Sequence, residues 1–192
     1  GDRVVYQGPL GAYAESRLVP ADRCIKLPED IDDKTAAAVF LKGVTVYCLL
    51  RRTFPVTKDS VILWHAASGG VGVIASQWAS SLGATVIGTV GSEAKAEIAR
   101  AHGCGHTILY RETDFVAAVK DLVPEGVHAV LDGVGKDTFI PSFDCTRPFG
   151  MLVNYGNASG HVPPVDMILL SKKGSLSISR PGYSAHVAKP ED

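Results

Sequence analysis

The sequence has 192 residues, of which 46% are hydrophobic and 20% charged, so it can bury a substantial core in one large domain or in one domain and part of another. Its 19 basic and 20 acidic side chains leave a net charge of −1, without the basic stripe expected of a nucleic-acid-binding protein. It contains no apolar run long enough to span a bilayer, and no signal peptide is seen at its start, so we expect no membrane insertion.

The first part of the chain predicts short strands followed by one long helix. Strands are expected at residues 4–6 and 13–19, around the turn Gly8-Pro9-Leu10-Gly11, and again at 24–27. Asp32 or Asp33 can cap a helix over residues 35–52, which is apolar on nearly every face and is therefore expected to lie buried between two layers. Because the chain opens on a strand-like segment and ends without a closing helix, we expect it to be part of a longer protein.

From residue 60 onward, apolar strands alternate with helices. Strands that are apolar throughout and separated by helices predict a parallel sheet covered on both faces, and six of them match a complete dinucleotide-binding fold. The sequence thus predicts an α/β protein with a doubly wound, six-stranded Rossmann sheet. The strands are expected at residues 61–64, 85–90, 106–109, 127–131, 151–155 and 175–179, and the helices at 71–82, 93–101, 113–123, 137–143 and 165–170.

A glycine-rich turn follows the first strand of this sheet. The run Ala66-Ala67-Ser68-Gly69-Gly70-Val71-Gly72 fits G-x-G-x-x-G with Ala67 in the first glycine position. Gly69 would let the backbone approach a pyrophosphate, Gly72 would let the helix pack closely on the strand, and the helix N-terminus would face the phosphates. The alternative is a tight turn between strand and helix in some other doubly wound protein.

The end of the second strand indicates which dinucleotide is bound. NAD-binding domains place an acid there for the ribose hydroxyls, but the strand here runs into Gly91-Ser92-Glu93, where Ser92 is expected to cap the next helix and Glu93 to lie in its first turn. The missing acid and the nearby Lys95 favour a 2′-phosphate, and hence NADPH. Taken alone, Lys95 could equally be a solvent-facing helix lysine.

The four cysteines do not show the spacing of a zinc site or of a disulfide framework. None forms a C-x-x-C pair, and disulfide frameworks are typical of shorter, secreted domains. We therefore expect free and mostly buried thiols in a reducing, cytoplasmic compartment. The residues are Cys24, Cys48, Cys104 and Cys145.

Taken in order, these motifs resemble the zinc-free quinone oxidoreductase (zeta-crystallin-like) branch of the medium-chain dehydrogenase/reductase superfamily. The resemblance covers essentially the whole chain and is strongest at His65–Gly72. It is supported by Gly1-Asp2-Arg3-Val4, Gly11-Ala12-Tyr13, Leu41-Lys42-Gly43-Val44-Thr45, Gly88-Thr89-Val90-Gly91, Asp132-Gly133-Val134-Gly135, Tyr155-Gly156-Asn157 and Arg180-Pro181.

The resemblance implies a division of the chain and a set of site residues. Residues 1–42 would be the tail of a GroES-like, β-rich catalytic domain with a linking helix, residues 43–182 the NADPH-binding Rossmann domain, and residues 183–192 the start of the return to the catalytic domain. Arg180 would point into the active-site cleft as the candidate catalytic residue. The cofactor would be held by Thr45, Cys48, Gly69, Gly70, Val71, Gly72, Ser92, Lys95, Tyr110, Val134, Tyr155, Gly156 and Asn157.

Each residue chosen by resemblance has a plainer alternative. Tyr110 could be a surface tyrosine, Cys48 an ordinary buried thiol and Arg180 an edge arginine, and His65 is better explained as a buried strand-end histidine than as a base. Only Tyr6 to Leu10 separate the first strand from Gly11, which leaves no room for the four-cysteine zinc lobe of zinc-dependent relatives, and we predict no metal site.

The resemblance also implies an activity and an assembly. NADPH would give hydride or electrons to a quinone or an activated alkene, and two copies would pair as a homodimer through the edge strand at 175–179. One alternative is an enoyl or alkenal reductase of the same superfamily. The other is a non-enzymatic NADPH-sensing or RNA-binding relative, against which the balanced charge argues.

Overall fold

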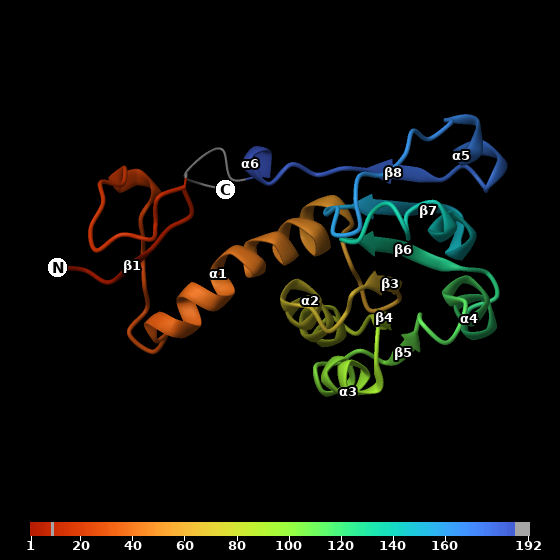
Figure 1. Cartoon of the computed structure of the whole chain (residues 1–192), viewed down its shortest axis with the longest axis horizontal. Coiled ribbons are helices and arrows are strands. Elements are labelled where there is room, and N and C mark those ends of the chain that lie inside the picture. Colours follow the sequence, from red (N-terminus) through yellow and green to blue (C-terminus); the bar gives the residue numbers. More distant parts are fainter. Residues whose placement is uncertain (9, 187–192) are drawn as a thin grey trace.

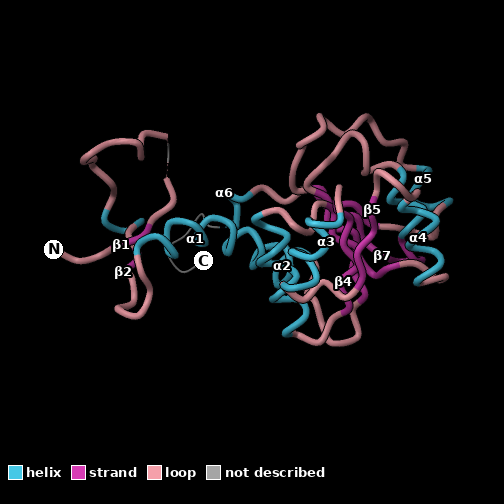
Figure 2. Tube along the Cα trace, turned by 60° about the horizontal axis from the view of Figure 1, so that its bottom comes forward, coloured by secondary structure: helices cyan, strands magenta, loops and turns pink. Residues whose placement is uncertain are grey.

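The computed structural model describes residues 1–8 and 10–186. A small N-terminal unit is joined by one long helix to a larger body built on a six-stranded sheet (Figures 1 and 2). Most of the segment expected to lead back to the catalytic domain, residues 187–192, lies outside the described residues. No helix in the described part of the chain is both long enough and apolar enough to cross a membrane.

The sheet confirms the predicted doubly wound Rossmann fold. All its strands are parallel, in the order β5-β4-β3-β6-β7-β8, so the chain builds outward from β3 in one direction and then crosses over to continue in the other. Its strands are β3 (Val61–His65), β4 (Thr85–Val90), β5 (His106–Leu109), β6 (Val127–Asp132), β7 (Thr146–Asn154) and β8 (Ser177–Ser179).

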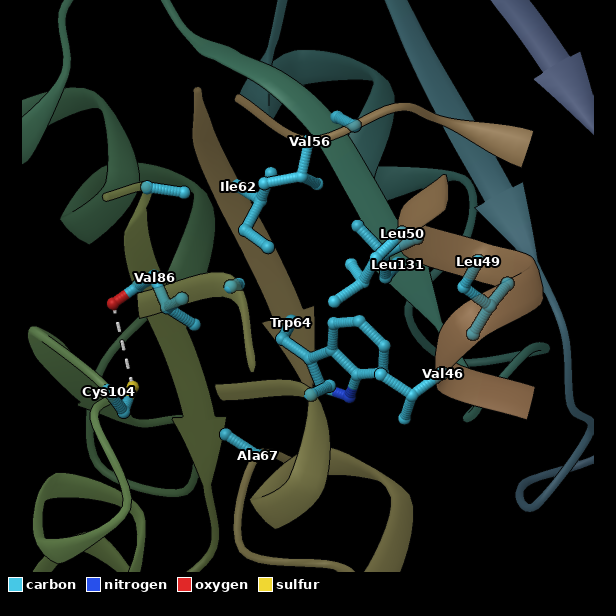
Figure 3. Packing of buried hydrophobic residues seen from close by; sticks show 14 of the residues in the cluster. Val46, Leu49, Leu50, Val56, Ile62, Trp64, Ala67, Val86, Cys104 and Leu131 are labelled. Carbon is cyan, nitrogen blue, oxygen red and sulfur yellow. Dashed lines mark hydrogen bonds between the residues drawn. The ribbon is translucent and has the colours of Figure 1, made fainter. Parts of the chain in front are cut away.

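Helices cover both faces of the sheet because successive strand residues point to opposite sides. Ile62 and Trp64 join the core beneath α1 (Asp33–Tyr47), α2 (Gly70–Ser81) and α3 (Glu93–Ala101). Leu63 joins a second core beneath α4 (Phe115–Leu122), η3 (Pro141–Cys145) and α5 (Ile168–Lys172). In the first core the indole of Trp64 reaches toward Val46 near the end of α1 (Figure 3). The body therefore has two hydrophobic cores with the sheet between them.

The N-terminal unit contains less regular structure than predicted. β1 (Val4–Val5) pairs antiparallel with β2 (Ile25–Lys26), and η1 (Ala21–Arg23) precedes β2. The strand predicted at 13–19 is wrong, because these residues form bends and loop in which Tyr13 and Leu18 are exposed. A β-rich composition is not enough for a strand there, since no strand in residues 1–8 or 10–186 pairs with this segment.

The long helix begins as predicted but is not buried throughout. Asp32 caps α1 by accepting a hydrogen bond of 2.9 Å from the backbone N–H of Thr35. After Tyr47 the helix widens into the π-helical turn η2 (Cys48–Thr53). The predicted burial between two layers is wrong for the first half of α1, where Val39 and Leu41 are exposed, because that half spans the distance between the two units (Figure 1). Only its last turns and η2 pack on the sheet.

Four other elements differ in extent from the prediction, and one of them is the strand expected at 151–155, which as β7 begins earlier, at Thr146. The helix expected at 137–143 is a run of turns followed by η3, because Pro141 lies at the start of a short 3₁₀ helix. The helix expected at 165–170 begins later, at Ile168, after Asp166 accepts the N–H of that residue. The last strand is shorter than expected, and a brief helix α6 (Tyr183–His186) follows it. Three of the four cysteines are buried, as predicted, and none of the four forms a disulfide with another described residue.

Candidate cofactor site

The sequence-predicted residues gather along one edge of the sheet. Because the strands are parallel, the loops after their carboxyl ends share that edge, and the change of winding direction falls between β3 and β6, which is the place where such sheets bind ligands. Gly69, Gly70, Val71 and Gly72 follow β3; Ser92 and Lys95 follow β4; Tyr110 follows β5; Val134 follows β6; Tyr155, Gly156 and Asn157 follow β7; and Arg180 follows β8.

The glycine turn after β3 is closely packed against its own backbone. Gly69 occupies the N-cap of α2, and Ala66 holds the left-handed conformation with a φ of 58°, which is costly for a residue with a side chain. A Cβ on Gly72 would lie 2.6 Å from the carbonyl oxygen of Ala67 and 2.7 Å from that of Ala66. The turn therefore requires glycine at position 72, and the first N–H groups of α2, which have no partner within the helix, lie at this edge of the sheet.

A buried histidine fixes the base of this turn. Nδ1 of His65 lies 3.0 Å from the hydroxyl of Thr89 and Nε2 lies 2.9 Å from that of Ser142, and all three side chains are buried. The Thr89 hydroxyl also accepts from the backbone N–H of Ala66 at 3.3 Å. Burial lowers the pKa of His65 to about 3, so the ring is neutral at physiological pH. This geometry makes His65 a structural residue, as the sequence suggested.

The loops after β4 and β5 carry Ser92, Lys95, Tyr110 and Arg111, and these four residues are called the cationic corner below. A Cβ on Gly91 would lie 3.0 Å from the hydroxyl of Tyr110 and 3.5 Å from Nε of Arg111, so both side chains border this glycine. Lys95 is exposed on the first turns of α3. Glu93, the acid of that first turn, is ion-paired with Arg100. Sequence reasoning missed Arg111, although it directly follows Tyr110.

Ser92 occupies the position predicted for it but does not act as a side-chain cap. It is the N-cap residue of α3 in extended conformation, and its side chain makes no capping hydrogen bond. The exposed hydroxyl is therefore available beside Lys95 in the cationic corner.

A buried carboxylate shapes the turn after β6. Oδ1 of Asp132 accepts the backbone N–H of Val134 at 2.8 Å, the N–H of Gly135 at 3.1 Å and the hydroxyl of Thr138 at 2.9 Å. Burial raises the pKa of Asp132, and its Oδ2 has no hydrogen-bond partner among the described residues. Asp132 therefore sets the conformation of the loop that carries Val134, a role that the sequence motif did not predict.

Arg180 ties the loop after β7 to the end of β8. Its guanidinium donates to Oδ1 of Asn154 and, at 3.2 Å, to the carbonyl oxygen of Gly156. The amide of Asn154 in turn donates to the carbonyl of Gly156 at 2.8 Å. Arg180, Asn154 and Asn157 line a cavity of about 460 Å³ that Phe139 and Ile178 close with apolar surface.

The side chains of three residues chosen by resemblance turn inward or lie away from this edge. Tyr155 packs its ring 5.5 Å from that of Trp64, and burial raises the pKa of its phenol. Cys48 is buried in the first position of η2. Thr45 is half-buried on α1 and donates its hydroxyl to the carbonyl of Leu41 at 2.8 Å. The structure brings these three to the layer of α1, η2 and Trp64.

The arrangement fits a phosphorylated dinucleotide. A diphosphate can approach the α2 N-terminus because Gly69, Gly70 and Gly72 present backbone there without side chains. A further phosphate can be met by Lys95, Tyr110 and Arg111 at the next strand end. Within the described residues, no three His, Cys, Asp or Glu side chains are grouped in a way that could hold a metal ion.

Comparison with known proteins gives consistent matches. A family model described as zinc-binding dehydrogenase matches residues 70–186. The quinone oxidoreductase of Pseudomonas aeruginosa is 47% identical over 193 residues, covering 100% of this chain and 59% of that protein. The 2-haloacrylate reductase of a Burkholderia species is 49% identical over 177 residues, covering 90% of this chain and 53% of that protein.

A solved structure shares both the fold and the sequence. The crystal structure of Escherichia coli quinone oxidoreductase complexed with NADPH superposes with a TM-score of 0.96 at 46% identity, covering 100% of this chain and 59% of that one. The chain thus spans about three fifths of the length of the relatives it matches.

Proposed function

The chain belongs to the zinc-binding dehydrogenase family, and we propose that it is the NADPH-binding part of a quinone oxidoreductase. The observation that carries the proposal is that the glycine turn and the cationic corner lie on one edge of the sheet. The turn follows β3, and the corner follows the next two strands, β4 and β5. Relatives named quinone oxidoreductase, one of them solved with NADPH, support it. Both features are needed, since the first suits any dinucleotide and the second selects one with a 2′-phosphate.

In this proposal the residues of the chain hold and orient the cofactor. Gly69, Gly70 and Val71 at the start of α2 would hold the pyrophosphate, and Ser92, Lys95 and Tyr110 would hold the 2′-phosphate. Val134, Gly156 and Asn157 would border the nicotinamide end, and Thr45, Cys48 and Tyr155 would form the layer beneath it. When bound, NADPH supplies the hydride that reduces the quinone.

Arg180 is the candidate for stabilising negative charge on the substrate oxygen. Such charge needs donors placed in advance, and the guanidinium is held at the cavity by Asn154 and the carbonyl of Gly156. These bonds leave other guanidinium N–H groups for a substrate. We propose that Arg180 acts as this donor without a metal ion, a prediction that rests on the absence of zinc-ligand spacing in the sequence.

The domain division stays a proposal that a comparison of chains can test. Residues 1–42 would belong to the catalytic domain and residues 43–182 to the cofactor domain. The relatives are longer than this chain, and their remaining part should exclude water from the cleft, so this chain should bind NADPH but reduce quinones much more slowly than a chain that includes that part. Equal rates for the two would contradict the division, and a chain that binds no NADPH would contradict the function.

A second substrate class is favoured by one relative. The 2-haloacrylate reductase, at 49% identity, indicates that this scaffold can act on an activated alkene. A panel of quinones and activated alkenes, tested with the full-length protein, separates the two. Cofactor sensing or RNA binding is the third candidate, and a salt-titrated RNA-binding assay tests it.

We also propose a cytoplasmic homodimer. β8 lies at the edge of the sheet, where an unpaired strand offers its backbone to a second copy. Ile178 on this strand is partly exposed and bears no charge to discourage pairing. The reducing compartment is proposed because none of the four cysteines forms a disulfide with another described residue.

A further inference from the structure

One lysine of α1 lies against the start of α2. A Cβ on Gly70 would be 2.8 Å from Cε of Lys42, 3.0 Å from its Cδ and 3.5 Å from its Nζ. Lys42 therefore extends its side chain across the first residue of α2, at the point where that helix presents its free N–H groups. None of the motifs considered in the sequence assigns a role to this residue.

The ammonium of Lys42 is positioned but not neutralised. It donates one hydrogen bond of 2.9 Å to the carbonyl of Ala38, one turn back on its own helix. An ammonium has three donors, so two stay available. Within residues 1–8 and 10–186 it forms no ion pair with a carboxylate. A cation that is held by a carbonyl and lacks a counter-ion is suited to an anionic ligand.

The glycines of the turn have different neighbours, which indicates different reasons for them. Gly72 faces the backbone of Ala66 and Ala67, so it is needed for helix packing. The three atoms nearest to a Cβ at position 70 all belong to Lys42, so a side chain at this position would press on the lysine where it crosses the start of α2. The absence of a side chain at position 70 therefore serves the placement of the ammonium.

We propose that Lys42 binds the pyrophosphate of the dinucleotide together with the N-terminus of α2. This inference rests on the proposed function. The helix end supplies N–H groups and a partial positive charge, and the lysine adds a full charge from outside the glycine motif. NADPH and NADH both contain the pyrophosphate, so Lys42 raises the affinity for either dinucleotide. Lys95, by contrast, selects for the 2′-phosphate that only NADPH carries.

The test is the binding of four ligands to Lys42→Met, measured by calorimetric titration or competition. A charge-assisted hydrogen bond is worth about tenfold in affinity at an exposed site. NADPH, NADH and ADP should each bind about tenfold more weakly, whereas adenosine 2′-monophosphate, which has no pyrophosphate, should bind as to wild type. The losses should shrink as salt rises. Lys34→Met, on the first turn of the same helix, is the matched control and should change none of them.

Two further results complete the test. Lys42→Arg keeps the charge and should keep affinity within about threefold, and the unfolding of all variants in urea should match that of wild type. Unchanged NADH and ADP binding in Lys42→Met, or an equal loss in Lys42→Arg, would overturn the proposal. If wild type itself binds no dinucleotide, the proposed function fails, which is a separate outcome from failure of Lys42→Met to differ.

Discussion

The imidazole of His65 and the hydroxyl of Thr89 lie 3.0 Å apart and join the ends of two neighbouring parallel strands. Both are buried, and the second ring nitrogen is hydrogen-bonded to Ser142 of η3, on the face of the sheet that η3 covers. The network lies directly beneath Ala66, where the glycine turn begins. The rigid start of that turn therefore depends on a neutral histidine.

This dependence predicts a loss of stability in acid. Burial lowers the pKa of folded His65 to about 3, from about 6.5 when the chain is unfolded, so between these values the unfolded state binds the proton and the folded state does not. The free energy of unfolding should fall as pH drops from about 6.5 toward 3, by at most about 1.4 kcal/mol per pH unit from this group. Urea unfolding between pH 4 and 7 measures the slope.

The substitution His65→Gln separates the contribution of His65 to the pH dependence of stability from that of other titratable groups. Asp132 has a raised folded pKa and contributes in the opposite sense, because its folded state keeps a proton longer as pH rises. His65→Gln should therefore have a flatter or reversed slope, whatever its absolute stability. His106→Gln, at an exposed strand residue, should leave the slope as it is. A slope unchanged in His65→Gln would show that the buried ring is not its cause.

The glycine turn predicts unequal effects for neighbouring substitutions. Gly72→Ala places a Cβ 2.6 Å from one backbone oxygen and 2.7 Å from another, neither of which can move without shifting β3 or α2. Overpacking of this kind costs about 1–3 kcal/mol of unfolding free energy. Gly69→Ala meets one backbone oxygen at 3.1 Å and should cost less. Denaturant titration of both variants checks this, and equal stabilities would contradict the assigned packing role.

The sequence predicted the sheet well because its strands carry their own signal. Residues such as Ile62 to Trp64 are apolar on both faces, which suits only a strand covered on both sides. The glycine turn was predictable for a similar reason, since spacing within seven residues determines it. These features depend on local pattern, and the structure retains them.

The incorrect predictions concern segments whose structure depends on contacts with residues far away in the sequence. Tyr13 and Leu18 have β-rich surroundings but no strand beside them, and Val39 and Leu41 are apolar but face solvent. Lys42 and Gly70 are 28 positions apart, and only the packing of α1 on α2 shows that they meet. The left-handed Ser175, with a φ of 56°, delays the last strand beyond its predicted start.

The proposed dimer predicts that a charge on β8 produces monomers. Ile178 is partly exposed in the middle of this edge strand, whereas Leu176 is buried and donates its N–H to the carbonyl of Leu170. A proline at Leu176 would therefore damage the fold, and Ile178→Lys is the better probe, since lysine on an edge opposes strand pairing. Light scattering should then give the monomer mass. Ile98→Lys on α3 is the control, and a dimer that persists in Ile178→Lys would exclude this edge as the interface.

The final prediction concerns cofactor choice and rests on Lys95. The 2′-phosphate carries nearly two negative charges and three acceptor oxygens, and the exposed ammonium of Lys95 can meet it as a charged donor. Because exposure brings screening by solvent and salt, we expect a preference of about tenfold for NADPH over NADH from this residue. The neighbouring Glu93 does not oppose it, since Arg100 holds that carboxylate.

Lys95→Glu should weaken the binding of NADPH much more than the binding of NADH, because the new carboxylate repels the 2′-phosphate that only NADPH carries. The difference between the two losses of affinity should become smaller as the salt concentration rises. Arg111→Gln is the informative companion, since Nε of Arg111 borders the same corner at Gly91 and should account for part of any preference that survives. Calorimetric titration of both cofactors into wild type and the two variants measures each contribution. Equal losses for NADPH and NADH in Lys95→Glu would show that Lys95 does not contact the 2′-phosphate.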